Sequence, residues 1–318
     1  MKRVLCFGEA MIEMAPELSG RYKLGVAGDT LNMAVYLKRL AGLADVNCQV
    51  DYVSAVGQDQ ASQKIIDFCW DELLGIEHLY RLSGYSCGLY MISTDEFGER
   101  SFSYWRSNSA ARQIMQPLAM QHSLNNLLQS DIFFFSGISL AVITEQSRDN
   151  FFELLHKLKE SGVTVVFDPN YRPVLWHNKQ EAKEAFIRAF KCSDIVLPGM
   201  DDLREVFACY TSKDVLALFE QFACREVIIK NGSQSVVAKC GQELTEFTIT
   251  PVETVVDTTS AGDSFNGAYI MARIRGDSVI EAIDFAAQVA AEVIQHKGAI
   301  IPNQALKSFY LNTQSVNS

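Results

Sequence analysis

The stretch "VVDTTSAGDSFNGA", residues 255–268, places two threonines, two serines, two glycines and two aspartates between apolar flanks. The apolar-periodic sequence that follows predicts a helix starting inside it. Small residues at Ser260, Ala261 and Gly262 would let backbone N–H groups converge at that helix start, where the helix dipole also favours an anion. Asp263 could then accept a proton from an attacking hydroxyl. On this stretch alone, a simple turn with Asp263 as a helix cap is the favoured interpretation.

Short apolar runs alternate with helical patterns along most of the chain. The runs are rich in β-branched and aromatic residues and end on Gly, Asp or Asn, which is typical of buried parallel strands. They lie at residues 3–8, 50–57, 131–137, 163–170, 194–199 and 226–232. Helices are predicted at residues 29–42, 144–162 and 211–223, with Gly42 and Gly162 as C-cap glycines. The alternation predicts an α/β fold with a doubly wound, mostly parallel sheet and helices on both faces.

The domain organisation follows from this alternation and from the length of 318 residues. An α/β fold can reach this size as one unit, so we predict a single domain over about residues 1–310 and a C-terminal tail at 311–318. In such sheets, ligands bind at the carboxyl ends of the strands. We therefore expect the functional site at that edge.

Two segments depart from the alternation. Residues 84–106 alternate apolar and polar positions around the turn "DEFGE" at 95–99, which predicts an antiparallel hairpin. A second extended piece at 12–26 would join this hairpin in a small sheet. The two inserted segments, at about 12–26 and 84–108, would form a lid over a cleft.

The aromatic residues of the predicted hairpin need a partner surface. They are Tyr90, Phe102, Tyr104 and Trp105. Trp105 alternates with Tyr104 and Arg106, so it should face away from them. An exposed apolar hairpin indicates a homo-oligomer in which a second copy covers the lid.

Composition excludes several classes of function. The formal charge of −10, from 28 Lys and Arg against 38 Asp and Glu, argues against a nucleic-acid partner. No apolar run reaches the roughly 20 residues of a membrane span, and acids interrupt any signal peptide, so a cytoplasmic location without membrane contact is expected. Eight scattered cysteines without a CxxC pair indicate reduced thiols. Neither a P-loop motif nor GxGxxG after the first strand occurs, which argues against those two nucleotide sites.

A second glycine-bearing motif is "GVAGDTLNMAVYLKRLAG", residues 25–42. Its turn leads into a helix, so Gly28, Asp29 and Asn32 could all face the strand ends. Asp and Asn side chains there could bind the hydroxyls of a polyol. An ordinary helix start capped by Asp29 or Thr30 remains an equal alternative from these residues alone.

Together the two motifs resemble the signatures of the PfkB, or ribokinase-type, carbohydrate kinases. The matching segments are "AGDTLNMA" (27–34) and "DTTSAGDSFNGA" (257–268), in the family's order, and the resemblance covers about residues 3–303. It implies a ribokinase-like fold and transfer of a phosphoryl group from ATP, with Mg2+, to a sugar hydroxyl. It also implies that Asp263 is the catalytic base, beside an anion hole at residues 260–262 that contacts ATP. A monovalent cation is a further candidate cofactor.

Within this family, several segments look most similar to the kinases of 2-keto-3-deoxygluconate. These enzymes phosphorylate this sugar acid at its 6-hydroxyl. These segments are "GDTLN" (28–32), "GLY" (88–90), "GERSFSYWR" (98–106), "SGISLAV" (136–142), "FDPNYRPVLW" (167–176) and "GAIIP" (298–302). The resemblance implies that Arg106, with Tyr90 and Tyr104, contacts the sugar acid. It places Asn170 and Arg172 between the sugar and the ATP phosphates. Guanidinium groups suit a carboxylate, which a neutral hexose does not carry.

The resemblance also implies positions for ATP and Mg2+. In "KNGSQS" (230–235) it points to Lys230, Gly232 and Ser235 as ATP contacts. The family's Asn-x-x-Glu motif is replaced by residues 199–202, where Asp202 would bind Mg2+ through water. The family's acid near the end of the first strand would correspond to Glu13. Asp257 has three candidate roles: contacting substrate, shaping the loop or siting a cation.

Two other functions remain open from the sequence. One is a kinase of the same family that acts on a neutral sugar such as fructose. The other is a non-catalytic sugar-binding protein on the same fold, since fold alone does not determine function. Asp263 and its anion hole argue against the second alternative, because a binding protein needs no base there.

Overall fold

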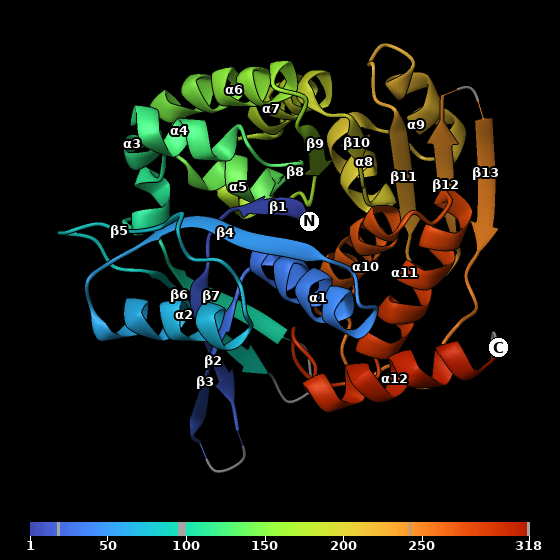
Figure 1. Cartoon of the computed structure of the whole chain (residues 1–318), viewed down its shortest axis with the longest axis horizontal. Helices are drawn as coiled ribbons and strands as arrows, with labels where there is room; N and C mark the ends of the chain where they lie inside the picture. Colours follow the sequence, from blue (N-terminus) through green and yellow to red (C-terminus); the bar gives the residue numbers. More distant parts are fainter. Residues whose placement is uncertain (18–19, 95–99, 242, 317–318) are drawn as a thin grey trace.

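The computed structural model describes residues 1–17, 20–94, 100–241 and 243–316. Its larger sheet has nine strands, and all six predicted apolar runs contribute a strand to it (Figure 1). From edge to edge the strands are β13 (Glu243–Thr248), β12 (Ser235–Cys240), β11 (Glu226–Asn231), β10 (Ile195–Val196), β9 (Thr164–Asp168), β8 (Ile132–Ser136), β1 (Lys2–Phe7), β4 (Cys48–Val56) and β5 (Leu79–Arg81). Strands β11 through β5 pair in parallel, whereas β12 and β13 are antiparallel.

Alternating side chains of the central strands enter two separate hydrophobic cores. In β8, Phe134 packs in one core, while Phe133 and Phe135 pack in the other. A strand that is buried on both faces needs apolar residues at consecutive positions, which explains its continuous apolar run. Strand β10 is shorter than predicted, because Pro198 has no N–H to continue the ladder.

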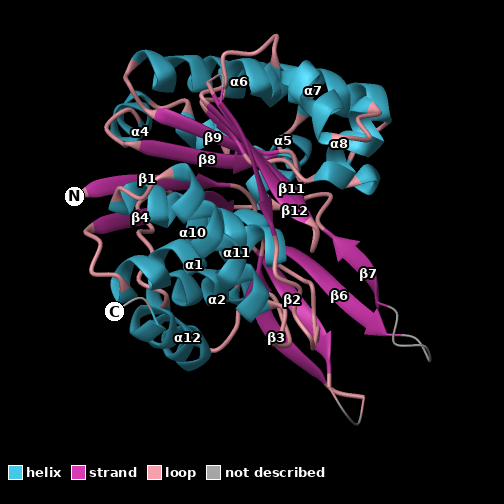
Figure 2. Ribbon diagram, turned by 90° about the vertical axis from the view of Figure 1, so that its right-hand side faces the viewer, coloured by secondary structure: helices cyan, strands magenta, loops and turns pink. Residues whose placement is uncertain are grey.

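Helices cover both faces of the large sheet, as predicted (Figure 2). One face carries α1 (Asp29–Leu43), α2 (Gln60–Asp71), α10 (Ala261–Arg275), α11 (Val279–Val293) and α12 (Asn303–Val316). The other carries α3 (Met115–Leu118), α4 (Gln121–Leu127), α5 (Gly137–Val142), α6 (Glu145–Glu160), α7 (Lys179–Cys192), α8 (Met200–Phe207) and α9 (Ser212–Phe219).

Three details differ from or refine the predicted helices. Gly42 lies inside α1 and is not its cap, because the helix continues to Leu43. Gly162 has φ +85° just after the end of α6, as a C-terminal glycine does. The predicted tail boundary at residue 310 falls within α12, because the helical pattern continues to Val316.

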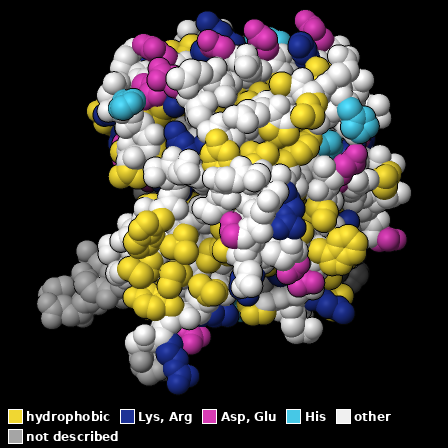
Figure 3. All heavy atoms as spheres, turned by 90° about the vertical axis from the view of Figure 1, so that its left-hand side faces the viewer, with side chains coloured by type: hydrophobic (Ala, Val, Ile, Leu, Met, Phe, Trp, Pro, Cys, Tyr) yellow, Lys and Arg dark blue, Asp and Glu magenta, His cyan; other side chains and the backbone are white. Residues whose placement is uncertain are grey.

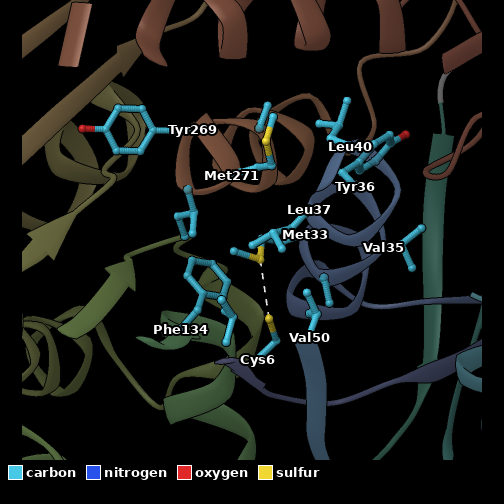
Figure 4. Packing of buried hydrophobic residues seen from close by; sticks show 14 of the residues in the cluster. Cys6, Met33, Val35, Tyr36, Leu37, Leu40, Val50, Phe134, Tyr269 and Met271 are labelled. Carbon is cyan, nitrogen blue, oxygen red and sulfur yellow. Dashed lines mark hydrogen bonds between the residues drawn. The ribbon is translucent and has the colours of Figure 1, made fainter. Parts of the chain in front are cut away.

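Helices α1 and α10 pack at short range. A Cβ on Gly267 of α10 would lie 2.7 Å from the carbonyl oxygen of Met33 in α1, so only glycine permits this approach. Figure 4 shows Met33 and Leu37 beside Met271, with the Cys6 thiol of β1 3.7 Å from the sulfur of Met33. This packing brings the starts of both helices, and therefore both motifs, to one end of the sheet.

The second sheet has four strands and contains both segments predicted as a lid. In order they are β3 (Tyr22–Ala27), β2 (Met11–Pro16), β6 (Gly88–Thr94) and β7 (Arg100–Trp105). The β2–β3 and β6–β7 pairs are antiparallel hairpins, and β2 and β6 join them in parallel. The predicted turn at 95–99 lies outside the described residues.

The cysteines have the character expected of reduced thiols. All eight are free, and all except Cys240 are buried. Among the described residues, no group of three or more His, Cys, Asp or Glu side chains is arranged to hold a metal ion. No described helix is both long and apolar enough to cross a membrane.

Candidate active site

A cavity of 1010 Å³ lies between the carboxyl ends of the large sheet's strands and the small sheet. Strand ends, the first turns of α1 and α10, and the small sheet all contribute to its lining. Fifteen of the residues predicted for the site line it: Gly28, Asp29, Asn32, Tyr90, Tyr104, Arg106, Asn170, Arg172, Asp202, Lys230, Gly232, Ser260, Ala261, Gly262 and Asp263. Segments from across the sequence therefore converge on one site.

Asp263 is the third residue of α10 and not its cap. The N-cap is Ser260, in the left-handed conformation with φ 65°. The Ser260 hydroxyl donates to Asp263 Oδ2 at 3.0 Å, and Asn32 Nδ2 donates to the same oxygen at 2.9 Å. The carboxylate is therefore oriented by side chains from both motifs, which a simple helix cap does not require.

The pKa of the Asp263 carboxyl is raised to about 7. Burial is the main cause, and the nearby negative charge of Asp29 adds to it, whereas the bonds from Asn32 and Ser260 oppose it. A carboxylate that exchanges its proton near neutral pH is suited to general base catalysis.

Asp29 begins α1 and faces the same cavity. Asn170, at the end of β9, donates from Nδ2 to Asp29 Oδ2 at 2.9 Å. Burial raises the pKa of Asp29 as well. Neither Asp29 nor Thr30 is the N-cap of α1, which is Gly28. A Cβ on Gly28 would lie 2.3 Å from the carbonyl oxygen of Glu9, so this close approach requires glycine.

Arg106 lines the cavity, and the resemblance implies that it contacts the sugar acid. Its Nη2 forms an ion pair with Glu9 Oε2, and the Glu9 side chain is fully buried. The other oxygen of Glu9 has no hydrogen-bond partner among the described residues. The guanidinium also lies 5.9 Å from the ring centre of Tyr104. Because the ion pair uses one terminal nitrogen, the rest of the guanidinium fork remains suited to a ligand carboxylate.

The acid directly after the first strand is Glu9, which lines the cavity, whereas the correspondence of Glu13 with the family's acid stays a prediction. Glu13 lies in β2, accepts a hydrogen bond from the Tyr90 hydroxyl and does not line the cavity. Strand β1 ends at Phe7, close to the predicted end at residue 8. The acid directly after this strand was the available signal for Glu9.

Tyr90 and Tyr104 lie directly opposite each other on β6 and β7, and both line the cavity. Trp105 does not line it, and 56% of its surface is exposed. The predicted alternation of side chains on this hairpin is confirmed.

A cluster of polar groups lies at the ends of β9 and β11. Lys230 Nζ donates to Asp168 Oδ2 at 3.1 Å and to Asn266 Oδ1 at 2.9 Å. Asn266 Nδ2 donates to the same Asp168 oxygen at 2.6 Å. Sequence analysis missed both Asp168 and Asn266, although an acid directly ending a buried strand was a usable signal for Asp168.

Asp202 and Arg172 border this cluster. The backbone N–H of Tyr171 donates to Asp202 Oδ1 at 2.9 Å. Burial, reinforced by the charge of Asp168, raises the pKa of Asp202 to about 6. A cation near Asp202 would relieve this unfavourable charge. Arg172 donates from Nη1 to the carbonyl oxygen of Tyr171 at 3.0 Å.

Ser235 lies outside the cavity, and Asp257 binds backbone groups. Ser235 is the first residue of β12, is buried in the pairing with Asn231, and does not line the cavity. Asp257 accepts from the backbone N–H groups of Thr259, at 3.1 Å, and Gly298, at 2.8 Å. These bonds support the role of Asp257 in shaping the loop before α10.

Comparison with known proteins agrees with the fold. Residues 1–306 match the family described as pfkB family carbohydrate kinase. The chain therefore belongs to the pfkB family of carbohydrate kinases.

Individual relatives in this family are named as kinases of different sugars. A 2-dehydro-3-deoxygluconokinase of Escherichia coli (strain K12) is 36% identical over 308 residues, which cover 96% of this chain and 99% of that protein. A fructokinase of Salmonella typhimurium is 27% identical over 267 residues, covering 83% of this chain and 81% of that protein. Among solved structures, the 2-dehydro-3-deoxygluconokinase of Thermotoga maritima has a TM-score of 0.82 at 19% identity, covering 98% of both chains. That last likeness concerns the fold alone.

Proposed function

We propose that this protein transfers the γ-phosphoryl group of ATP to the 6-hydroxyl of 2-keto-3-deoxygluconate. The products are 2-keto-3-deoxy-6-phosphogluconate and ADP. The observation that carries the reaction type is Asp263, a carboxylate with a pKa near 7 in the first turn of α10. The similarity to 2-dehydro-3-deoxygluconokinases over 96% of the chain supports the substrate. Arg106, which suits an acid, supports it independently.

In the proposed reaction, Asp263 takes the proton of the 6-hydroxyl as its oxygen attacks the γ-phosphorus. The bond from that phosphorus to the bridging oxygen breaks, and ADP leaves. The backbone N–H groups at the start of α10 stabilise charge on the transferred phosphoryl group. Asn32 and Ser260 hold the carboxylate in place.

The composition of the cavity fits a requirement for Mg2+. Among the described residues, seven carboxylate residues and three cationic residues line it, although it must accept a polyphosphate. Mg2+ commonly binds through one or two carboxylates, water and substrate phosphates, so a larger protein ligand cluster is unnecessary. We assign Asp202 to the Mg2+ site, where it would bind the ion through water. The bound ion supplies positive charge to the phosphate oxygens.

The small sheet forms the lid over the sugar-binding part of the cavity. Tyr90, Tyr104 and Arg106 extend from it into the cavity. We propose that they enclose the acid and exclude water, which limits hydrolysis of ATP. A neutral sugar would leave Arg106 without a carboxylate to bind, so the fructose alternative is less well supported.

The experiment that tests this function is a coupled assay of ADP release with ATP, Mg2+ and 2-keto-3-deoxygluconate. We expect ADP to form at a rate that depends on the sugar acid and saturates with it. The control contains ATP and Mg2+ without sugar, where little ADP should form. ADP release that does not depend on the acid would contradict the proposal.

We also propose that a second copy of the chain covers the small sheet on the face opposite the cavity. Leu24 and Trp105 lie on that face with 52% and 56% of their surfaces exposed. Figure 3 shows hydrophobic side chains gathered on the side of the molecule where the small sheet lies. Exposed apolar surface of this kind is typical of contact sites.

Size-exclusion chromatography with light scattering measures the oligomeric state and so tests whether a second copy covers this face. We expect the native protein to be a dimer or larger, and the double variant Leu24→Ser/Trp105→Ser to dissociate. Trp70→Ser, which changes a more exposed tryptophan on α2, should leave the assembly unchanged. A monomeric native protein at assay concentration would contradict the proposal.

A further inference from the structure

Asn266 is a buried polar side chain that has no role in the proposed reaction. Asn266 lies in α10 one turn beyond Asp263, and only 1% of its surface is exposed. With Asp168 from β9 and Lys230 from β11 it closes a triangle of hydrogen bonds at 2.6, 2.9 and 3.1 Å. The triangle therefore ties the helix that carries Asp263 to the ends of two strands.

The triangle places the Lys230 ammonium beside the anion hole. A Cβ on Gly262 would lie 3.7 Å from Lys230 Nζ, so the ammonium is next to the first turn of α10. Lys230 lines the cavity, with 15% of its side chain exposed. An ammonium has three N–H donors, and Asp168 and Asn266 occupy two of them. The third donor is available to a group bound in the cavity.

The chemistry of the two partners differs. Asp168 offsets the charge of Lys230, whereas the amide oxygen of Asn266 holds the ammonium without neutralising it. Asn266 also donates to the Asp168 oxygen that Lys230 contacts, so it shares that oxygen with the ammonium. Without Asn266, the ammonium would be free to turn towards Asp168 and away from the anion hole.

We propose that Asn266 is a positioning residue that holds the Lys230 ammonium against the phosphoryl group being transferred. This inference rests on the proposed function, because it requires a phosphoryl group at the start of α10. Lys230 would supply positive charge where negative charge develops, and Asn266 would act only through Lys230. A purely structural triangle would instead stabilise the fold without affecting turnover.

A double-mutant cycle with Asn266→Leu and Lys230→Met separates these roles. Both substitutions approximately preserve side-chain size. We expect Lys230→Met to lower kcat by about 100- to 1000-fold, as loss of one transition-state stabilising group does. Asn266→Leu should lower kcat by about 10- to 100-fold, as misplacement of a reacting group does. The KM for the sugar acid should change little in either variant.

The decisive result is the double variant. If Asn266 acts through Lys230, the double variant should have the same kcat as Lys230→Met alone. Multiplicative losses, or Asn266 variants that melt earlier yet keep native kcat, would overturn the proposal. Asn266→Ser, which is smaller and removes the same contacts, provides the second measurement if Asn266→Leu does not fold.

Tyr269→Phe is the matched control on the same helix. It removes a buried 2.6 Å hydrogen bond to Glu226 and does not alter the cavity lining. We expect it to lower the melting temperature while leaving kcat unchanged. If native protein phosphorylates another sugar instead, the proposed substrate is wrong and the cycle is measured with that sugar. If the native protein phosphorylates no sugar, the proposed function and this inference both fail.

Discussion

Asp263→Asn is expected to abolish phosphorylation while leaving sugar binding largely intact. Asparagine keeps the shape of the side chain but cannot take the proton of the attacking hydroxyl. A general base contributes about 100- to 10,000-fold to a rate, so kcat should fall by at least that range. The measurements are kcat from ADP release and the dissociation constant of the sugar acid from calorimetry.

The pH dependence of the native enzyme provides a second readout of the same prediction. Because the pKa of Asp263 is about 7, the carboxyl is protonated and inactive as a base at lower pH. The native kcat should rise with pH through this value, and the residual activity of Asp263→Asn should not. Asp284→Asn, the same change at an exposed site on α11, is the control and should behave as native. Near-full turnover in Asp263→Asn would remove Asp263 from its assigned role.

Arg106→Ala is expected to raise the KM for the sugar acid far more than the KM for ATP. Truncating one partner of a buried charge pair costs about 2–5 kcal/mol, which corresponds to at least a roughly 30-fold rise. Steady-state kinetics with each substrate varied in turn measures the two KM values. An unchanged KM for the acid would exclude Arg106 from the carboxylate site.

This substitution also leaves the buried Glu9 without its cation, which destabilises the fold by itself. The double variant Arg106→Ala/Glu9→Gln separates the two effects, because glutamine carries no charge. We expect the double variant to recover stability in thermal melts while the KM for the acid remains high. Recovery of both properties together would mean that the loss in Arg106→Ala came from the uncompensated Glu9 alone.

Most of the fold was predictable because local patterns and tertiary structure agree. The run of Phe133, Phe134 and Phe135 is a strand because each face of the sheet meets its own core. The hairpin was recognisable from its alternation, and Tyr104 and Trp105 do face opposite ways. Gly42 was predicted as a C-cap but lies inside α1. A Cβ at this position would meet nothing within 4 Å, so the helix tolerates glycine there without requiring it.

The candidate site was predictable where it depends on the two motifs, and less so elsewhere. Glu9 and Glu13 lie four residues apart, so only the true end of β1 decides which one enters the cavity. Asn266 looked like an ordinary helical residue, because its partners Asp168 and Lys230 come from distant strands. The roles of the individual site residues remain predictions, as do Mg2+, a monovalent cation, the homo-oligomer and the cytoplasmic location.

The most direct test of the central claim is the ratio of kcat/KM for 2-keto-3-deoxygluconate to kcat/KM for fructose, measured by ADP release under identical conditions. We predict a ratio of at least about 100, because fructose leaves the site's arginine without a carboxylate partner. A ratio near or below one would contradict the assignment of this protein as a sugar-acid kinase.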